Sequence, residues 1–262
     1  MRRFAVLILI SAVLVGCASS GGPGSEANSS ATPEASSPLY PLTLMRQGSV
    51  LLQRGRFDEA LKRFEKAREI QPQNATVYNM IGLCHLRKGE LPQAMQAFDK
   101  SLDLVPTFSD ALNNRGMTYL EMKQYRMAEV DLLAVLSDST YPHRKEVYYN
   151  LGMTELGKGD LNGAEENFRK AAEPPKPVFE ALMRLAEVAQ RQGQLDEAEA
   201  ILERARLEFP DRIEARLVLG RLLLLQGRKD EAKVQLDAVI EAAPSSDLAE
   251  RARKLLETGS GD

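Results

Sequence analysis

Apolar and small residues recur along this chain with a period of about 34 residues between positions 41 and 257. Each period has a small residue, an alanine twelve positions later and a large apolar residue four positions after the alanine. The small residues are Gly48, Gly82, Gly116, Gly152, Ala186 and Gly220, spaced by 34 residues except for one interval of 36. The alanines are Ala60, Ala94, Ala128, Ala164, Ala198 and Ala232, and the large residues are Phe64, Phe98, Leu132, Phe168, Leu202 and Leu236. Six matching periods predict a fold built from repeated pairs of helices.

The second period shows how one unit is expected to fold. Its pattern predicts a first helix over residues 78–88 and a second helix over residues 91–104, separated by Gly89. Glycine suits this turn because it readily adopts the left-handed conformation that commonly ends a helix. Lys123 holds the same position in the third period, so a less favourable turn is expected there. After the sixth period, residues 247–257 predict a terminal helix that covers the last apolar edge.

The combination of this period with the small residue, the Ala-x3-Phe spacing and a closing proline resembles the tetratricopeptide repeat. The resemblance implies an all-α fold over residues 39–257. That fold is a right-handed superhelix of about six helix-turn-helix repeats plus a C-terminal capping helix. Residues 258–262 are expected to form a disordered tail, and the resemblance also implies that the chain binds a partner protein.

The N-terminal residues have the pattern of a secretory signal peptide, with two arginines, an apolar run from Phe4 to Val15 and then small residues. About twelve apolar residues are too few to span a bilayer, so residues 1–16 are predicted to be removed. The end of this segment, Leu14 to Cys17, resembles the bacterial lipobox. That resemblance implies cleavage before Cys17, lipid attachment to its sulfur and acylation of the new N-terminus by a fatty acid such as palmitate. A plain signal peptide followed by a chance cysteine is the alternative.

The segment after the lipobox is rich in Ser, Gly, Ala and Pro, so residues 17–38 are predicted to be a lipidated flexible tether. Ala18, rather than aspartate, follows the cysteine. In lipoproteins of double-membrane bacteria this difference implies transfer to the outer membrane. The predicted location is therefore the periplasmic face of the cell outer membrane, with the lipid as the membrane anchor.

Charge and motif content narrow the possible functions. The chain has 34 basic and 37 acidic residues, and its net charge of −3 becomes −5 once Arg2 and Arg3 leave with the signal peptide. This balance leaves no basic stripe and argues against a nucleic-acid partner. Because no nucleophile, phosphate-binding or metal-binding motif occurs, the chain is predicted to be no enzyme and to use no cofactor, metal or small-molecule substrate. His85 and His143 lie far apart in sequence, and Cys84 is expected to be a buried thiol.

The tetratricopeptide resemblance also carries over a binding groove, because fixed positions of each first helix line the concave face in that family. On these positions the implied protein-binding groove contains Asn79, Leu83, Leu86, Asn113, Met117, Leu120, Tyr149, Met153 and Met183. The apolar members predict an adaptable contact surface. Asn79 and Asn113 are expected to hold the backbone amides of an extended peptide. The alternative is that the curvature of the superhelix simply buries these side chains.

Two additional residues separate the third and fourth periods, within residues 136–146. The Tyr141-Pro142 turn, the charged start of the next helix and the Asn-Leu-Gly sequence from Asn150 resemble the pilotin family of type IV pilus lipoproteins. This resemblance implies an outer-membrane protein that helps a secretin pore assemble, with a secretin subunit or another pilus component as its partner. The alternative is a general cell-envelope scaffold for peptidoglycan enzymes or for outer-membrane protein assembly. The irregular junction at 174–177 has no assigned role.

Overall fold

The structure is a computed structural model that describes residues 39–259. The predicted signal peptide, Cys17, the predicted tether and the last three residues lie outside this range. Within it the chain forms thirteen α-helices and no strand. The helices are α1 (Tyr40–Gln53), α2 (Phe57–Ile70), α3 (Ala75–Lys88), α4 (Leu91–Leu104), α5 (Ser109–Glu121), α6 (Tyr125–Ser137), α7 (Arg144–Lys158), α8 (Leu161–Ala171), α9 (Phe179–Arg191), α10 (Leu195–Glu208), α11 (Glu214–Leu225), α12 (Lys229–Ala242) and α13 (Asp247–Thr258).

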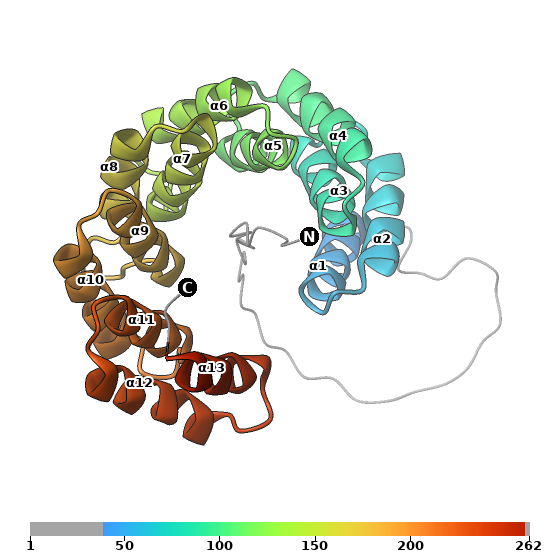
Figure 1. Ribbon diagram of the computed structural model, residues 1–262. Coiled ribbons are helices and arrows are strands. Elements are labelled where there is room, and N and C mark those ends of the chain that lie inside the picture. The colour runs from blue at the N-terminus through green and yellow to red at the C-terminus, as the bar shows by residue number, and fades with distance from the viewer. Residues whose placement is uncertain (1–38, 260–262) are drawn as a thin grey trace, which may run out of the picture. The chain divides into compact units, whose positions relative to one another are not determined.

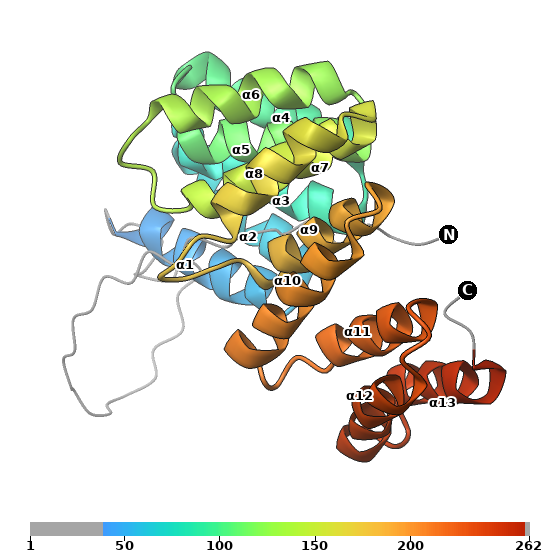
Figure 2. The ribbon, with the colours of Figure 1, turned by 60° about the vertical axis from the view of Figure 1, so that its left-hand side comes forward.

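The helices belong to two compact units, which divide between Tyr141 and Pro142, inside the irregular junction. In the first unit α1, α3 and α5 form one layer, and α2, α4 and α6 form a second layer against it (Figure 1). In the second unit α7, α9 and α11 form the corresponding layer, against α8, α10 and α12. Helix α13 lies beside α12 at the C-terminal end, as Figure 2 shows. The predicted all-α fold of six helical hairpins with a terminal helix is therefore confirmed.

The periodic small residue allows the two helices of a hairpin to pack closely. A Cβ atom added to Gly82 of α3 would lie 2.5 Å from the Phe98 ring of α4, far inside van der Waals contact. Phe98 is itself completely buried. The small residue therefore packs against the large residue sixteen positions later. Because both residues recur with the period, successive hairpins form the same contact.

The turn inside each hairpin follows the predicted chemistry. Gly89 ends α3 with a φ of 77°, in the left-handed region that glycine adopts without steric cost. Lys123 occupies the equivalent position after α5 with a φ of 59°, and among the described residues it is the only non-glycine with positive φ. The third hairpin therefore has the strained turn that its sequence predicts.

Two predicted helix boundaries are wrong by a few residues. Helix α3 begins at Ala75, three residues before the predicted start, because the Asn74 side chain accepts a hydrogen bond from the Thr76 N–H at 3.0 Å and caps the helix there. Helix α13 ends at Thr258, one residue late, and Gly259 closes it with a φ of 59°. The prediction of 91–104 for α4 is confirmed.

Both irregular junctions are tied back to a first-layer helix of their own unit. In the junction after α6, the buried Tyr141 donates a hydrogen bond from its hydroxyl to Asp110 Oδ1 of α5, at 3.1 Å. In the junction after α8, Lys145 Nζ of α7 donates to the carbonyl oxygen of Glu173 and, at 3.2 Å, to that of Lys176. Each irregular junction is thereby held by defined contacts to the repeat that precedes it.

Candidate protein-binding faces

Most of the predicted groove residues form the packed layer beneath the surface rather than the surface itself. We define the inner face of each unit as the side of its first-layer helices that points away from its second layer. Eight of the nine predicted residues are buried, and only Met183 is half-exposed; the buried ones are Asn79, Leu83, Leu86, Asn113, Met117, Leu120, Tyr149 and Met153. The predicted exposed apolar trough is therefore wrong, and the alternative of burial holds for these side chains. Contact between any of the nine and a partner stays a prediction.

The packing of α3 explains this correction. Leu83 and Leu86 belong to one hydrophobic cluster with Leu44 and Leu52 of α1. A first-layer helix is thus flanked by its neighbours in the same layer as well as by its hairpin partner. The apolar side chains on these sides are covered, which stabilises the unit but removes them from direct contact with solvent.

The two predicted amide anchors differ in their availability. Asn79 Oδ1 accepts a hydrogen bond from Asn114 Nδ2 at 2.9 Å, which links α3 to α5. Asn113 is only 5% exposed, and its Oδ1 atom has no hydrogen-bond partner among the described residues. Its Nδ2 atom makes a weak contact of 3.7 Å with Met117 Sδ. A buried carbonyl oxygen without a donor costs free energy that a backbone N–H of a bound peptide would recover.

Accessible apolar side chains on the first unit's inner face come from α1, which the sequence prediction did not include. Leu42 is 58% exposed, and Met45 is half-buried. Leu42 and Met45 stand six and three residues before Gly48, at the positions that Thr76 and Asn79 occupy before Gly82. Applying the same repeat positions to the first period would have identified both residues.

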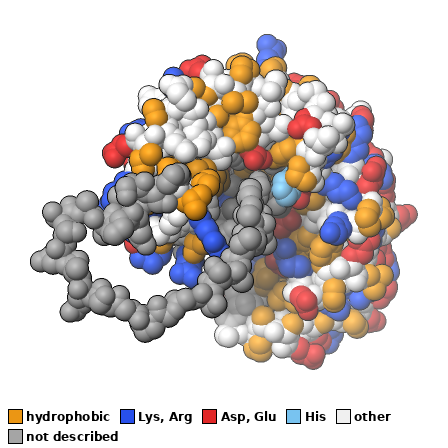
Figure 3. All heavy atoms as spheres, turned by 180° about the vertical axis from the view of Figure 1, so that it is seen from behind, with side chains coloured by type: hydrophobic (Ala, Val, Ile, Leu, Met, Phe, Trp, Pro, Cys, Tyr) orange, Lys and Arg blue, Asp and Glu red, His pale blue; other side chains and the backbone are white. Residues whose placement is uncertain are grey.

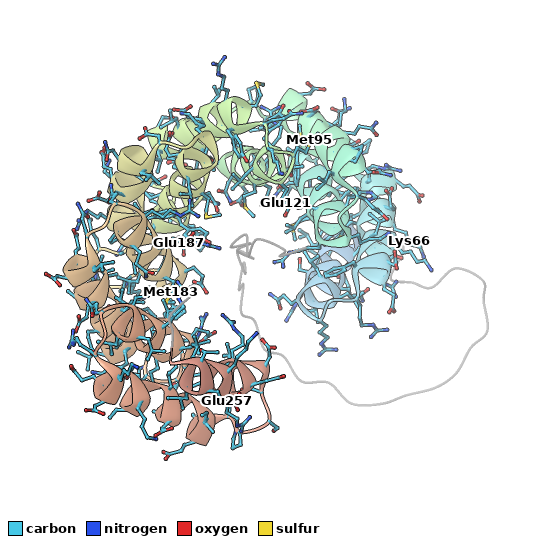
Figure 4. All side chains as sticks on the ribbon, in the orientation of Figure 1. Lys66, Met95, Glu121, Met183, Glu187 and Glu257 are labelled. Carbon is cyan, nitrogen blue, oxygen red and sulfur yellow. The ribbon has the colours of Figure 1, made fainter. Side chains whose placement is uncertain are left out.

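Two charged side chains border this face. Glu121 lies at the end of α5 on the inner face (Figure 4), and Arg87 lies near the end of α3. Loss of hydration raises the pKa of the Glu121 carboxyl, an effect that the positive charge of Arg87 partly opposes. Loss of hydration likewise lowers the pKa of Arg87, and Glu121 partly restores it. Arg87 and Glu121 therefore form a partly desolvated, charged rim beside Asn113 and the apolar side chains of the inner face.

The second unit offers a more charged inner face. Met183 and Glu187 of α9 point away from α10 (Figure 4). Glu187 accepts hydrogen bonds from Arg184 Nη1 and from Arg191 Nη2, each at 2.6 Å. Burial raises the pKa of the Tyr149 hydroxyl of α7, which also hydrogen-bonds to Arg184. Met183 is therefore a half-exposed apolar side chain on a helix that also carries the Arg184, Glu187 and Arg191 charge network.

The described residues contain few features of a catalytic or metal-binding site. Acidic and basic side chains are interspersed on the face shown in Figure 3. Cys84 is completely buried, and burial raises the pKa of its thiol to about 12, so the reactive thiolate is suppressed. No group of three or more His, Cys, Asp or Glu side chains within residues 39–259 is placed to hold a metal ion. None of the helices in this range is both long and apolar enough to cross a membrane.

Comparisons with known proteins agree with the repeat pattern. Sequence families described as tetratricopeptide repeat match residues 45–107, 97–130, 155–215 and 189–256. No curated protein sequence matches the chain.

Among solved structures, PilF of Pseudomonas aeruginosa is 23% identical over 82% of this chain and 96% of its own, with a TM-score of 0.69. PilW, a widely conserved type IV pilus biogenesis factor, is 18% identical over 82% of this chain and 98% of its own, with a TM-score of 0.72. YrrB, a repeat protein with an unusual peptide-binding site, is 23% identical over 73% of this chain and 98% of its own, with a TM-score of 0.54.

Proposed function

Since the chain belongs to the tetratricopeptide-repeat family, in which the repeats mediate contacts between proteins, we propose that it binds a partner polypeptide on the inner face of its first unit. The observation that carries this proposal is the combination of an unsatisfied buried amide oxygen on Asn113 with accessible apolar side chains on the same layer. Those side chains are Leu42 and Met45 of α1. A site of this composition suits a polypeptide rather than a small molecule, because the groups are spread over three helices.

The proposed binding mode is an extended segment that crosses α1, α3 and α5. The Asn113 side chain, which is only 5% exposed in the free protein, turns outward on binding so that its Oδ1 atom accepts a hydrogen bond from a backbone N–H of the segment. An apolar side chain of the segment packs on Leu42 and Met45. The rim formed by Arg87 and Glu121 offers one cation and one anion to polar groups of the segment.

The proposed setting is type IV pilus biogenesis, with the protein assisting secretin assembly at the periplasmic face of the outer membrane. Three observations support it. The lipobox-like sequence ending at Cys17 suits a lipid-anchored protein, the inserted junction around Tyr141 resembles that of pilotins, and the fold is similar to those of PilF and the pilus biogenesis factor PilW. The secretin subunit is accordingly the proposed partner, and the general envelope scaffold is the rival that an experiment must separate from it.

The proposal predicts that Leu42→Glu in the full chain lowers the amount of co-purifying secretin at least about tenfold, since it places a charge in the apolar contact. The measurement is the secretin recovered with the protein from solubilised outer membranes, together with the amount of assembled secretin. Leu207→Glu on α10 is the matched control, because Leu207 is 67% exposed and lies outside the proposed face. Equal secretin recovery with the two variants would contradict the proposal. If a cell-wall enzyme instead co-purifies with the parent chain and is lost with Leu42→Glu, the general envelope scaffold is the correct function.

A further inference from the structure

The solvent-facing side of α6 differs from that of every other second-layer helix. Met127, Val130 and Leu133 follow one another at a spacing of three residues and are 48%, 63% and 52% exposed. The same repeat positions are mostly charged or polar elsewhere: Glu59, Lys62 and Glu65 in α2, Gln93, Gln96 and Asp99 in α4, Gly163, Glu166 and Arg169 in α8, Glu197, Ala200 and Glu203 in α10, and Glu231, Val234 and Asp237 in α12. Only α6 presents three large apolar side chains there, which we name the α6 stripe. An apolar stripe kept in water has no structural benefit for the hairpin itself.

The start of α6 also departs from the repeat, in charge. Arg126 stands in the first turn of the helix, at the position held by Asp58 in α2, Asp196 in α10 and Asp230 in α12. Lys123 precedes it in the strained left-handed turn. Both are exposed, and neither forms an ion pair within residues 39–259. Cations at a helix N-terminus oppose the helix dipole, so both residues lower local stability.

These departures coincide on one helix: the α6 stripe adds no stability to the isolated chain, and Lys123 and Arg126 lower it. Sequences usually break local rules in this way where a function compensates for the loss. A surface that binds this side of α6 must therefore offer apolar side chains to the α6 stripe and negative charge to Lys123 and Arg126. The C-terminal end of α6 itself offers this negative charge. Its backbone carbonyls carry the negative end of the helix dipole, and the Asp138 carboxylate follows, held by the hydroxyl groups of Ser109 at 2.9 Å and Thr140 at 2.6 Å.

We propose that α6 is a self-association surface, on which the α6 stripes of two copies of this chain pack antiparallel. Val130 lies midway between Met127 and Leu133, so a two-fold axis at Val130 places each Met127 against the Leu133 of the second copy. The same arrangement brings Lys123 and Arg126 to the negative end of α6 in the second copy. The surface is therefore complementary to itself in both shape and charge.

A contact made by one helix from each copy lies below the roughly 1,200 Å² of total buried area that is usual for stable dimers. The association is accordingly weak and reversible, with dimers accumulating between about 1 and 100 µM. It uses the outer side of α6 and leaves the inner face of the first unit open. Partner binding and self-association are thus separate properties, and the loss of one leaves the other intact.

Sedimentation equilibrium of the full chain carrying Cys17→Ser tests the proposal, because this change allows measurement without detergent. The average mass should rise from one chain towards two over the stated concentration range. Val130→Glu should abolish the rise, with unchanged far-ultraviolet circular dichroism. The matched control is Val234→Glu on α12, because Val234 occupies the same repeat position and is equally exposed, at 64% against 63%, but has acidic neighbours. A parent chain that stays monomeric at 100 µM, or an equal effect of the two substitutions, overturns the proposal.

Disulfide trapping tests the antiparallel register in the same background, where the only native thiol is the buried Cys84. Val130→Cys lies on the proposed axis and should cross-link to its own counterpart under mild oxidation, as disulfides require Cα atoms within about 7 Å. Met127→Cys should cross-link poorly with itself and efficiently when mixed with Leu133→Cys. Efficient self-linking of Met127→Cys, or trapping of Val234→Cys as readily as Val130→Cys, rules out the antiparallel α6 contact.

Discussion

Gly82 shows how a single residue type sets the distance between two helices. Alanine is the better helix former by about 0.5–1 kcal/mol. The structure nevertheless leaves no room for a methyl group, because its carbon would lie 2.5 Å from the Phe98 ring, which is fully buried and closely packed. The cost of overpacking therefore exceeds the gain in helix propensity, and glycine is the stable choice at this position.

We predict that Gly82→Ala lowers the free energy of unfolding by about 1–3 kcal/mol, because Phe98 must leave its preferred position. Urea unfolding followed by circular dichroism measures the change. Gly116→Ala is the control and should cost less, since its added carbon would lie 3.0 Å from Cγ and 3.2 Å from Cδ2 of Leu132, against 2.5 Å from the Phe98 ring at Gly82. Equal stability of Gly82→Ala and the parent chain would show that helix propensity outweighs packing here.

Side chains of the first-layer helices mark where reasoning from sequence reaches its limit. The contact between Gly82 and Phe98 could be predicted, since both residues recur in a fixed pattern within one hairpin. The burial of Leu83 and Met117 could not, because it depends on how closely neighbouring hairpins approach one another. Glutamate at these two sites would disrupt the core rather than report on a binding surface. Leu42 is the better probe, as its repeat position is uncovered on the first helix.

At the scale of helices, one arginine joins three elements of the first unit. Arg115 of α5 donates from Nε to Asp131 of α6 and from Nη1 to Asp99 of α4, both at 2.8 Å. The hydrogen bond to Asp131 is the largest contribution that raises the pKa of Arg115. Asp131 is only 4% exposed, and Arg115 is the cation paired with it. The pairing also fixes α6 against α5 although the outer side of α6 has no partner within the unit.

We predict that Arg115→Ala costs about 3–5 kcal/mol of unfolding free energy, because it leaves the buried Asp131 carboxylate without its cation. Asp99→Asn is the control and should cost less than about 1 kcal/mol, since the Asp99 side chain is 52% exposed and water screens its charge. Chemical unfolding at neutral pH measures both. Similar losses for the two variants would mean that burial of Asp131 does not control the strength of the network.

Helix order and helix length were largely predictable, and the character of each surface was not. The period places six hairpins correctly, and the prediction for α4 is confirmed residue for residue. Asn74 extends α3 beyond its predicted start because one side-chain hydrogen bond decides the boundary. The α6 stripe was visible in the sequence as a departure of Met127, Val130 and Leu133 from the repeat, but only the structure shows that these side chains are exposed among residues 39–259.

At the scale of the molecule, the six repeats fall into two compact units that divide at the inserted junction. The predicted repeat region of residues 39–257 therefore contains two bodies, each with its own layers. The division follows from the sequence, because the two additional residues interrupt the 34-residue period between Gly116 and Gly152. Tyr141 then secures the first unit's end through its hydrogen bond to Asp110.

The proposed anchor makes a prediction about the complete chain in its bacterial envelope. Cys17 is the proposed site of lipid attachment and lies before the residues that the structure describes. Two or more acyl chains bind a membrane stably, whereas a protein without them returns to the aqueous phase. Cys17→Ser should therefore move the protein from the outer-membrane fraction to the soluble periplasmic fraction. The helical content should be unchanged, because the packed helices begin only at Tyr40.

Cell fractionation with immunodetection measures this change, and Cys84→Ala provides the control for the loss of a cysteine. Cys84 is completely buried in the first unit's hydrophobic cluster, so its replacement leaves the proposed acylation site intact and the protein in the membrane fraction. Secretin assembly should fall in the Cys17→Ser strain even though Leu42 and Asn113 are unaltered, because the binding face is then no longer held at the membrane. Cys17→Ser protein that stays with the membrane after a high-salt wash would contradict anchoring through this residue, since salt removes electrostatic attachment but not acyl chains.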